Sequence, residues 1–195
     1  MQPATEADAS ANNSNPASPS TGPMLPPPAV RATGLGPTAV PASGDAATMT
    51  GEGLLLPVQG ITAAQLQDTF TDARSGGRVH DAIDIMAPRG TPVLATSDGK
   101  VEKLFTSALG GLTIYEFDPT TTWVYYYAHL DRYADGLAEG QSLHRGEVIG
   151  YVGSSGNASP DAPHLHFEVS RLGPEKHWWQ ASPANPYPLL GGKPH

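Results

Sequence analysis

The chain has 195 residues, no cysteine and a formal net charge of −8. The negative charge argues against a nucleic-acid partner, and the lack of cysteine excludes both disulfides and a lipid-modified cysteine. No run of about 18 apolar residues is present that could span a membrane as a helix.

The first segment, residues 1–52, is dominated by Ala, Pro, Ser, Thr, Asn and Gly and contains no aromatic residue. Such a segment buries too little apolar surface to offset the loss of chain entropy, so we expect a disordered tether. It also lacks the positive start and apolar stretch of a signal peptide. Either an export signal lies upstream of this start, which we favour, or export uses another route.

The remaining segment, residues 53–195, has the length of one domain with its own core. Leu54–Val58 leads into it, and the pattern from Thr62 to Gln65 predicts a brief helix with a capping box. From His80 to Ile85, isoleucines alternate with His80, Ala82 and Asp84. The spacing of four also suits a helix, but the β-branched alternation favours a strand with His80 and Asp84 on one face.

Two hairpins are predicted next. Residues 91–95 and 100–105 flank an Asp-Gly turn, and residues 111–117 and 123–129 flank an Asp-Pro turn. In the second hairpin His129 is expected on the same face as Tyr125 and Tyr127. Those two tyrosines are candidates for lining a substrate groove.

The last two predicted strands are 148–152 and 164–170. On the second of these, alternation directs His164 and His166 to one face and Leu165, Phe167 and Val169 to the opposite face, into a core. The strands follow one another too closely for crossover helices. We therefore predict a mainly β fold, a compact antiparallel sheet or sandwich-like domain.

Four of the seven histidines fall in these predicted strands. A short histidine pair alone is weak evidence, since it also suits a polar outer face. Glu168, which shares the face of His166, suits two interpretations equally: a partner that fixes an imidazole tautomer, or a solvated edge carboxylate.

Between the histidines, further motifs occur in a fixed order. From about Leu54 to Leu190 the chain resembles the lysostaphin-type (LytM-like, M23) zinc metallopeptidases, which cut peptide bonds in bacterial cell walls. The motifs that carry the resemblance are H-x-x-x-D from His80, Pro88–Val93, Asp98–Val101, Tyr127–Leu130, Gly140-Gln141, Gly146–Gly150, Val152–Asn157 and H-x-H from His164. The resemblance implies a compact antiparallel β-sheet with a groove closed by loops.

The resemblance also implies roles for five residues. His80, Asp84 and His166 correspond to the ligands of one Zn²⁺ per chain. His129 and His164 correspond to the residues that act on the metal-bound water and the transition state. Two positions depart from the pattern, because many members have Gly where this chain has Ala82 and Ala162. Neither removes a ligand, although the methyl of Ala82 is expected to narrow the floor of the cleft.

The chemistry of these residue types agrees with those roles. Two imidazoles and one carboxylate leave a tetrahedral zinc ion with an open position, as in catalytic zinc sites. The chain lacks H-E-x-x-H, so two further histidines are the expected proton carriers. Two histidines and a carboxylate also bind Fe(II) in oxygenases, but those enzymes usually space the first pair as H-x-D.

The sequence thus predicts a zinc endopeptidase of the cell envelope that acts on peptidoglycan peptides. The alternative is a catalytically inactive scaffold that binds the wall or activates an amidase, because some members of the family have lost ligands. Retention of all five groups favours the enzyme.

Overall fold

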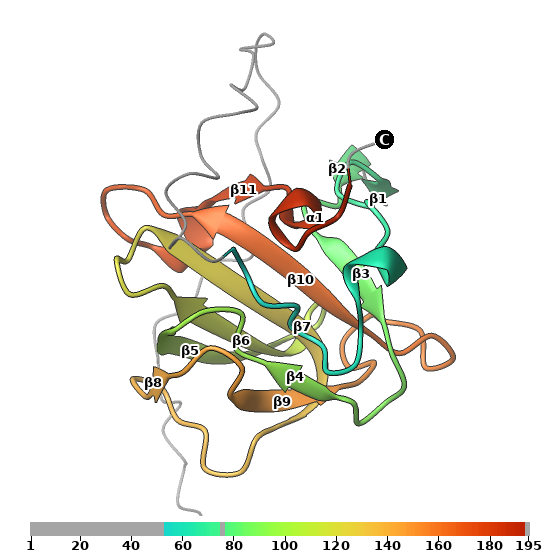
Figure 1. The fold of residues 1–195 in the computed structure, drawn as a ribbon, viewed down its shortest axis with the longest axis horizontal. Helices are drawn as coiled ribbons and strands as arrows, with labels where there is room; N and C mark the ends of the chain where they lie inside the picture. The colour runs from blue at the N-terminus through green and yellow to red at the C-terminus, as the bar shows by residue number, and fades with distance from the viewer. Residues whose placement is uncertain (1–52, 75–76, 194–195) are drawn as a thin grey trace, which may run out of the picture. The chain divides into compact units, whose positions relative to one another are not determined.

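In a computed structural model, residues 53–74 and 77–193 are described. The predicted tether, residues 1–52, lies outside the described residues, so its boundary with the domain stays a prediction. The described part is mainly β, which confirms the predicted fold class (Figure 1). Its elements are η2 (Ala63–Gln65), β1 (Ala73–Arg74), β2 (Arg78–Val79), β3 (Ile83–Met86), β4 (Pro92–Leu94), β5 (Gly99–Ser107), β6 (Gly111–Phe117), β7 (Trp123–Tyr133), β8 (Ser142–Leu143), β9 (Val148–Val152), β10 (His164–Arg171), η4 (Trp178–Gln180), β11 (Ser182–Ala184) and α1 (Pro186–Leu189).

Within the described residues, nine strands form one antiparallel sheet and β1 and β2 form a separate ribbon. The main path of the sheet is β11-β10-β7-β6-β5-β8, with β3 added beside β10 and β9 joining β7 to β4. Long strands β10 and β7 cross the centre of the molecule in Figure 1. None of the described helices is long and apolar enough to cross a membrane.

The hairpin predicted at Asp98-Gly99 is wrong. Strand β4 pairs with β9 instead of with β5. Asp98 accepts a hydrogen bond from the backbone N–H of Arg145 at 2.8 Å, and Gly99 pairs with Leu143 of β8. The Asp-Gly pair therefore ties β5 to a distant segment of the chain. The hairpin of β6 and β7 and the strands β9 and β10 are confirmed.

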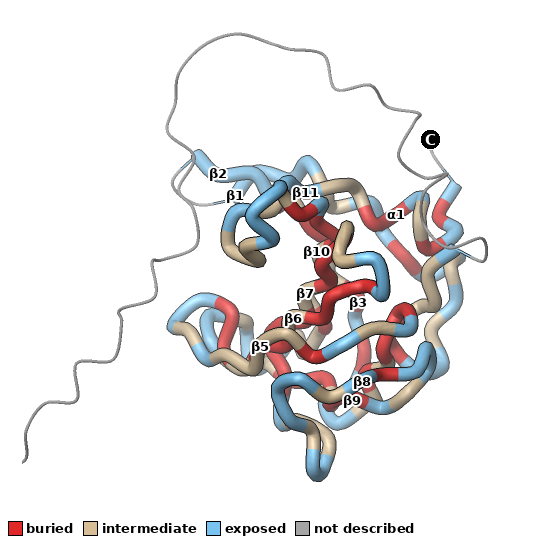
Figure 2. Tube along the Cα trace, turned by 90° about the vertical axis from the view of Figure 1, so that its left-hand side faces the viewer, coloured by how far each residue is buried: buried red, intermediate tan, exposed pale blue. Residues whose placement is uncertain are grey.

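One face of the sheet carries the main hydrophobic core. Leu165, Phe167 and Val169 of β10 belong to it, as predicted from their alternation. Tyr125 and Tyr127 of β7 also belong to it and are almost completely buried, so the prediction that they line a groove is wrong. In Figure 2 the buried segments gather in the central strands, whereas β1 and β2 lie at the exposed margin.

A carboxyl group is buried within this core. Glu116 of β6 is completely buried and accepts a hydrogen bond from Tyr127 Oη at 2.5 Å, and Tyr127 Oη accepts one from the backbone N–H of Thr96. The second oxygen of Glu116, Oε1, has no partner among the described residues. Burial raises the pKa of Glu116 to about 8, although the bond from Tyr127 opposes the shift.

This carboxyl is expected to make stability depend on pH. Between the ordinary pKa of 4.5 and about 8, the folded protein binds the proton more tightly than the unfolded chain does. The free energy of unfolding therefore falls as pH rises through this window, by on the order of a few kcal/mol, and is level above it. Glu116→Gln should reduce the decrease in the free energy of unfolding between pH 5 and pH 8, as measured by urea unfolding at the two pH values.

The matched control is Glu139→Gln. Glu139 is half-exposed and paired with Lys103, and that hydrogen bond lowers the pKa of the carboxyl. Its variant should keep the difference between pH 5 and pH 8 seen in the wild type. An unchanged difference in the Glu116→Gln protein would contradict the assignment.

Candidate metal centre

The pairing of β3 with β10 brings two predicted ligands together. Asp84 and His166 are direct partners in the register of these strands, so both side chains lie on one face. His166 Nδ1 lies 3.1 Å from Asp84 Oδ1, and His80 Nε2 lies 3.0 Å from each of these two atoms. Among the described residues these three side chains form the group that could hold a metal ion.

His80 reaches this group by a different route from the one predicted. The strand expected from His80 to Ile85 is interrupted, because Asp81 adopts φ +57° and β3 begins only at Ile83. The two side chains therefore do not meet by alternation along one strand. Instead, Nδ1 of His80 donates to the backbone carbonyl of Thr69 at 2.9 Å, which directs Nε2 toward Asp84.

The donor set fits a cation. In neutral His80 the proton on Nδ1 leaves Nε2 as a lone pair, and Asp84 Oδ1 is an acceptor. His166 Nδ1 can carry at most one proton. That proton cannot form a full hydrogen bond to both His80 Nε2 and Asp84 Oδ1. Three acceptor atoms that lie within 3.1 Å of one another are therefore best satisfied by a metal ion. Zn²⁺ commonly takes imidazole nitrogen and carboxylate oxygen.

His129 joins the group through a bulge in β7. Against β6, Leu112 pairs with Leu130 and Ile114 with Tyr127, so β7 carries one extra residue here. His129 has φ +61° and its N–H donates to the carbonyl of Gly110 at 2.8 Å. Tyr127 and Leu130 both enter the core, whereas the ring of His129 lies beside those of the candidate site. The prediction that His129 shares a face with Tyr125 and Tyr127 is therefore wrong.

The imidazoles of His129 and His164 are oriented by backbone carbonyls. Nδ1 of His129 donates to Ser155 O at 2.9 Å, and Nδ1 of His164 donates to Ala162 O at 2.8 Å. In the neutral imidazole this places the proton on Nδ1 and leaves Nε2 with a free lone pair. The ring of His129 lies 5.0 Å from that of His164 and 5.6 Å from that of His166, centroid to centroid. Nε2 of His164 lies 3.8 Å from Asp84 Oδ1.

Burial and charge set the protonation of this group. Burial lowers the pKa of His129 to about 4, with the bond to Ser155 opposing the shift, so the ring is neutral at pH 7. Burial also lowers the pKa of His166, and the neighbouring carboxylate of Asp84 opposes this shift. Burial would raise the pKa of Asp84, but the adjoining imidazoles of His166 and His80 outweigh it and hold the pKa far below its usual range. The carboxylate is therefore ionised.

The loop that contains Ser155 and Gly156 packs against the start of β6, and this contact holds the carbonyl that orients His129. Gly111 of β6 and Gly156 have φ values of +64° and +72°, and a Cβ atom built on Gly156 would lie 2.3 Å from Gly111 N. Only glycine allows this approach of two backbones. Ser155 Oγ also bonds Leu112 N and Leu130 O across the bulge. These links hold Ser155 O in place.

Three neighbours of the site complete its description. Ala82 is completely buried, so its methyl does not narrow an open floor. Glu168 is half-buried and accepts a hydrogen bond from Ser170 Oγ, and no hydrogen bond joins it to an imidazole nitrogen among the described residues, so both interpretations of its role stay predictions. Tyr126, not predicted, lies on the site face opposite Glu168, with its ring 6.0 Å from that of His166. Alternation counted from His129 would place Tyr126 on the other face, so its position follows only from the bulge in β7 and the register with β10.

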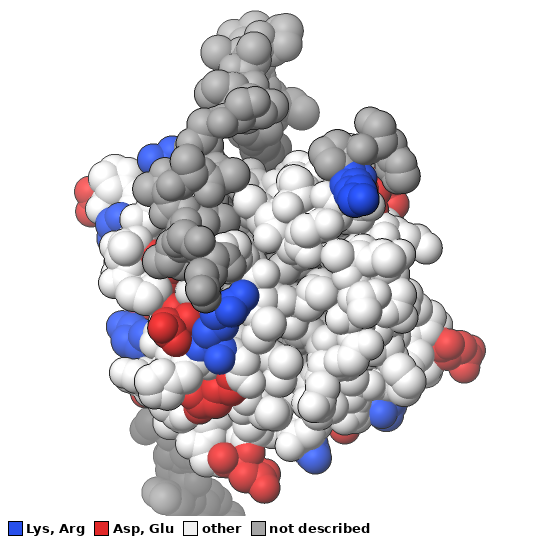
Figure 3. Space-filling model, viewed as in Figure 1, with Lys and Arg blue, Asp and Glu red and all other residues white. Residues whose placement is uncertain are grey.

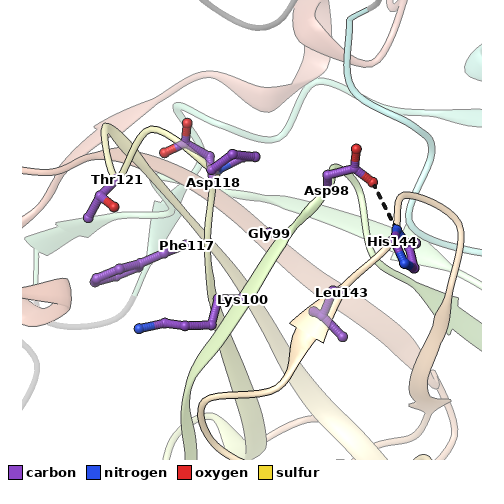
Figure 4. Close-up of a pocket in the computed structure, with 9 residues that line it drawn as sticks. Asp98, Gly99, Lys100, Phe117, Asp118, Thr121, Leu143 and His144 are labelled. Atoms are coloured by element: carbon purple, nitrogen blue, oxygen red, sulfur yellow. Dashed lines mark ion pairs between the residues drawn. The ribbon is translucent and has the colours of Figure 1, made fainter.

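An open hollow at the other end of β6 is unrelated to these histidines. It is lined by Asp98, Gly99, Asp118 and His144, among others (Figure 4). The carboxylate of Asp118 is bonded to the N–H groups of the turn that follows it, and Asp98 is bonded to Arg145 N. These acidic groups serve the turns, so the hollow has no converging donor set.

Comparison with known families decides where the chain belongs. The model of peptidase family M23 matches residues 78–186, more than half of the chain, and this range includes all five predicted site residues. The chain belongs to peptidase family M23. Within this M23 chain, the five positions lie on the segments that the structure brings together.

Several curated relatives are named as endopeptidases. Over 142 residues this M23 chain is 37% identical to the L-Ala–D-Glu endopeptidase of Bacillus subtilis, a match that covers 69% of the chain and 41% of that protein. Over 96 residues it is 41% identical to the DD-carboxypeptidase/endopeptidase Mpg of Neisseria meningitidis, which covers 47% of the chain and 20% of that protein. The chain therefore matches less than half the length of either relative.

Solved structures share the fold. The catalytic domain of lysostaphin from Staphylococcus simulans aligns with a TM-score of 0.52 and 28% identity, covering 73% of this chain and 91% of that one. A zinc-containing peptidase from Vibrio cholerae aligns with a TM-score of 0.53 and 26% identity, and the alignment covers 68% of this chain and 39% of that one. These likenesses agree with the mainly β fold described above.

Proposed function

We propose that this M23 chain is a zinc-dependent endopeptidase that hydrolyses stem or cross-link peptides of bacterial peptidoglycan. His80, Asp84 and His166 hold the metal, and His129 and His164 are the catalytic residues. The observation that carries the proposal is the convergence of His80 Nε2, Asp84 Oδ1 and His166 Nδ1 to within 3.1 Å, with two further imidazoles beside them.

The bound zinc ion would supply Lewis-acid polarisation of the scissile carbonyl and lower the pKa of water to about 7. The protein supplies the rest. With Nδ1 tied to a backbone carbonyl, His129 and His164 each present Nε2 toward the reacting atoms. A neutral imidazole there accepts a proton from the attacking water, and an imidazolium stabilises the oxyanion and gives a proton to the leaving amine.

The division of labour between His129 and His164 follows from their surroundings. Burial keeps His129 neutral at pH 7, which suits it to accept a proton. His164 lies beside the carboxylate of Asp84, with Nε2 3.8 Å from Oδ1, next to the proposed metal. We therefore assign the proton acceptor to His129 and the oxyanion partner to His164.

The second candidate, an inactive wall-binding or amidase-activating scaffold, is less well supported. A scaffold needs neither a converging donor set nor two oriented imidazoles, yet this chain retains all five groups. Two of them, His129 and His164, are oriented by the backbone carbonyls Ser155 O and Ala162 O, which a scaffold would not need.

Substrate binding is proposed to rest on shape and hydrogen bonds more than on net charge. The chain is acidic, with a net charge of −8, and bacterial walls are anionic. On the face seen in Figure 3 a mixed group of charged side chains lies left of the centre, and the centre itself is uncharged. The cell envelope is the compartment where this substrate occurs, so we place the protein there.

Digestion of purified sacculi tests the proposed function and the bond cleaved. Sacculi with glycine bridges and sacculi with direct D-amino-acid cross-links are incubated separately with the zinc-loaded protein, and the fragments are identified by mass. We expect release of peptides with new amino termini from at least one of the two. Binding to sacculi without any new terminus, at zinc occupancy near one per chain, would favour the scaffold.

A further inference from the structure

An arginine outside the predicted site contacts one of the candidate ligands. Arg74 Nη2 donates to Asp84 Oδ2 at 2.6 Å. The other oxygen, Oδ1, is the one that faces His80 and His166. The two oxygens of one carboxylate thus serve two different partners.

The contact does not serve the stability of the fold. Arg74 is 40% exposed and Asp84 is 20% exposed, so the pair lies at the surface. Exposed ion pairs contribute about 0–1 kcal/mol to stability, and Arg74 lies on the two-stranded ribbon apart from the nine-stranded sheet. What the contact fixes is the rotation of the Asp84 carboxylate.

The ribbon that carries Arg74 is built around the candidate site. Its preceding turn supplies Thr69, whose carbonyl accepts from His80 Nδ1 and whose Oγ1 accepts from Asp84 N at 3.3 Å. His80 N also donates to Asp72 O at 2.9 Å, just before β1. The segment from Thr69 to Arg74 therefore contacts both His80 and Asp84 from one side.

We propose that Arg74 is a positioning residue that holds the Asp84 carboxylate so that Oδ1 alone is available to the metal ion. A carboxylate free to rotate could offer both oxygens, which would occupy the position that a hydrolytic site must leave open. Groups that hydrogen-bond the outer atom of a ligand commonly tune metal affinity in this way. This inference rests on the proposed metal centre and adds a residue that is not among the five predicted.

The test compares Arg74→Ala and Arg74→Lys with the wild type in full-length protein. Zinc affinity is measured by competition with a chromophoric chelator, and the cobalt-substituted proteins are compared by visible absorption, which reports coordination number. We expect Arg74→Ala to weaken zinc binding roughly 10- to 100-fold and to shift the cobalt spectrum toward higher coordination. Arg74→Lys keeps the charge with a less directional donor and should restore part of the affinity.

The matched control is Lys103→Ala, which removes a cation of similar exposure, 33%, from its pair with Glu139. It should leave zinc affinity and the cobalt spectrum unchanged, and the metal-free Arg74→Ala protein should melt like the wild type. Wild-type affinity and spectrum in Arg74→Ala, or tighter zinc binding, would overturn the inference while the proposed function stands. A wild-type protein that binds no zinc would instead refute the proposed function itself.

Discussion

Replacing His164 or His129 with Ala is expected to lower the rate of peptide hydrolysis by roughly two to four powers of ten while zinc is retained. Neither imidazole belongs to the three side chains whose donor atoms converge, so neither loss removes a ligand atom. Both rings lie beside that group, with Nε2 free and Nδ1 bonded to a carbonyl. Each therefore acts on the reacting groups and contributes little to metal binding.

The measurement is the initial rate of fragment release from dye-labelled sacculi, with zinc content determined on the same samples. His144→Ala is the control, because the side chain of His144 is 91% exposed and lies near Asp98, away from the site. It should digest sacculi at the wild-type rate. If the His129→Ala and His164→Ala proteins do the same, the two histidines are not catalytic.

Removal of the metal is expected to abolish hydrolysis and leave the domain folded. The main hydrophobic core contains none of the three candidate ligands, and β3 and β10 remain joined by backbone pairing. Chelation should therefore reduce digestion of sacculi to background with little change in far-ultraviolet circular dichroism. Addition of zinc should restore the activity.

Two results would contradict this second prediction. Continued digestion in excess chelator would mean that the reaction does not need the metal. Loss of the β-sheet signal on chelation would mean that the metal is structural, as in sites that fold only when loaded. The Asp84→Ala protein provides a check, because it should behave like the chelated wild type without any chelator.

The strands that carry most of the site could be predicted from local alternation. In β10, His164 and His166 point away from the core side chains Leu165 and Phe167, as the period of two requires. The β6–β7 hairpin also follows from its turn, where Asp118 accepts from the N–H groups of the residues that close it. Both features depend on contacts within a few residues.

The position of His129 depends on contacts far apart in the sequence. An extra residue in β7 is compatible with the same alternating sequence, and only the register with β6 shows where it falls. The positive φ of His129 is supported by Gly110 O and Ser155 O, which come from two other loops. No local pattern marks a bulge at a histidine.

The same limit explains the other differences. The turn expected at Asp98-Gly99 has the residues of a hairpin, but Asp98 bonds Arg145 N, which is 47 residues away. The bend at Asp81 places a residue other than glycine in the left-handed region. Arg74 has no motif of its own, since its role depends on which oxygen of Asp84 it contacts.

Zinc content of the His166→Ala and His164→Ala proteins, determined side by side by elemental analysis, tests the central claim most directly. The two residues lie on one strand and one face, so general damage to β10 would affect both variants alike. We predict that His166→Ala loses zinc and activity together, whereas His164→Ala keeps about one zinc per chain and loses activity alone. Zinc retained in His166→Ala and lost in His164→Ala would contradict the assignment of ligand and catalytic residue.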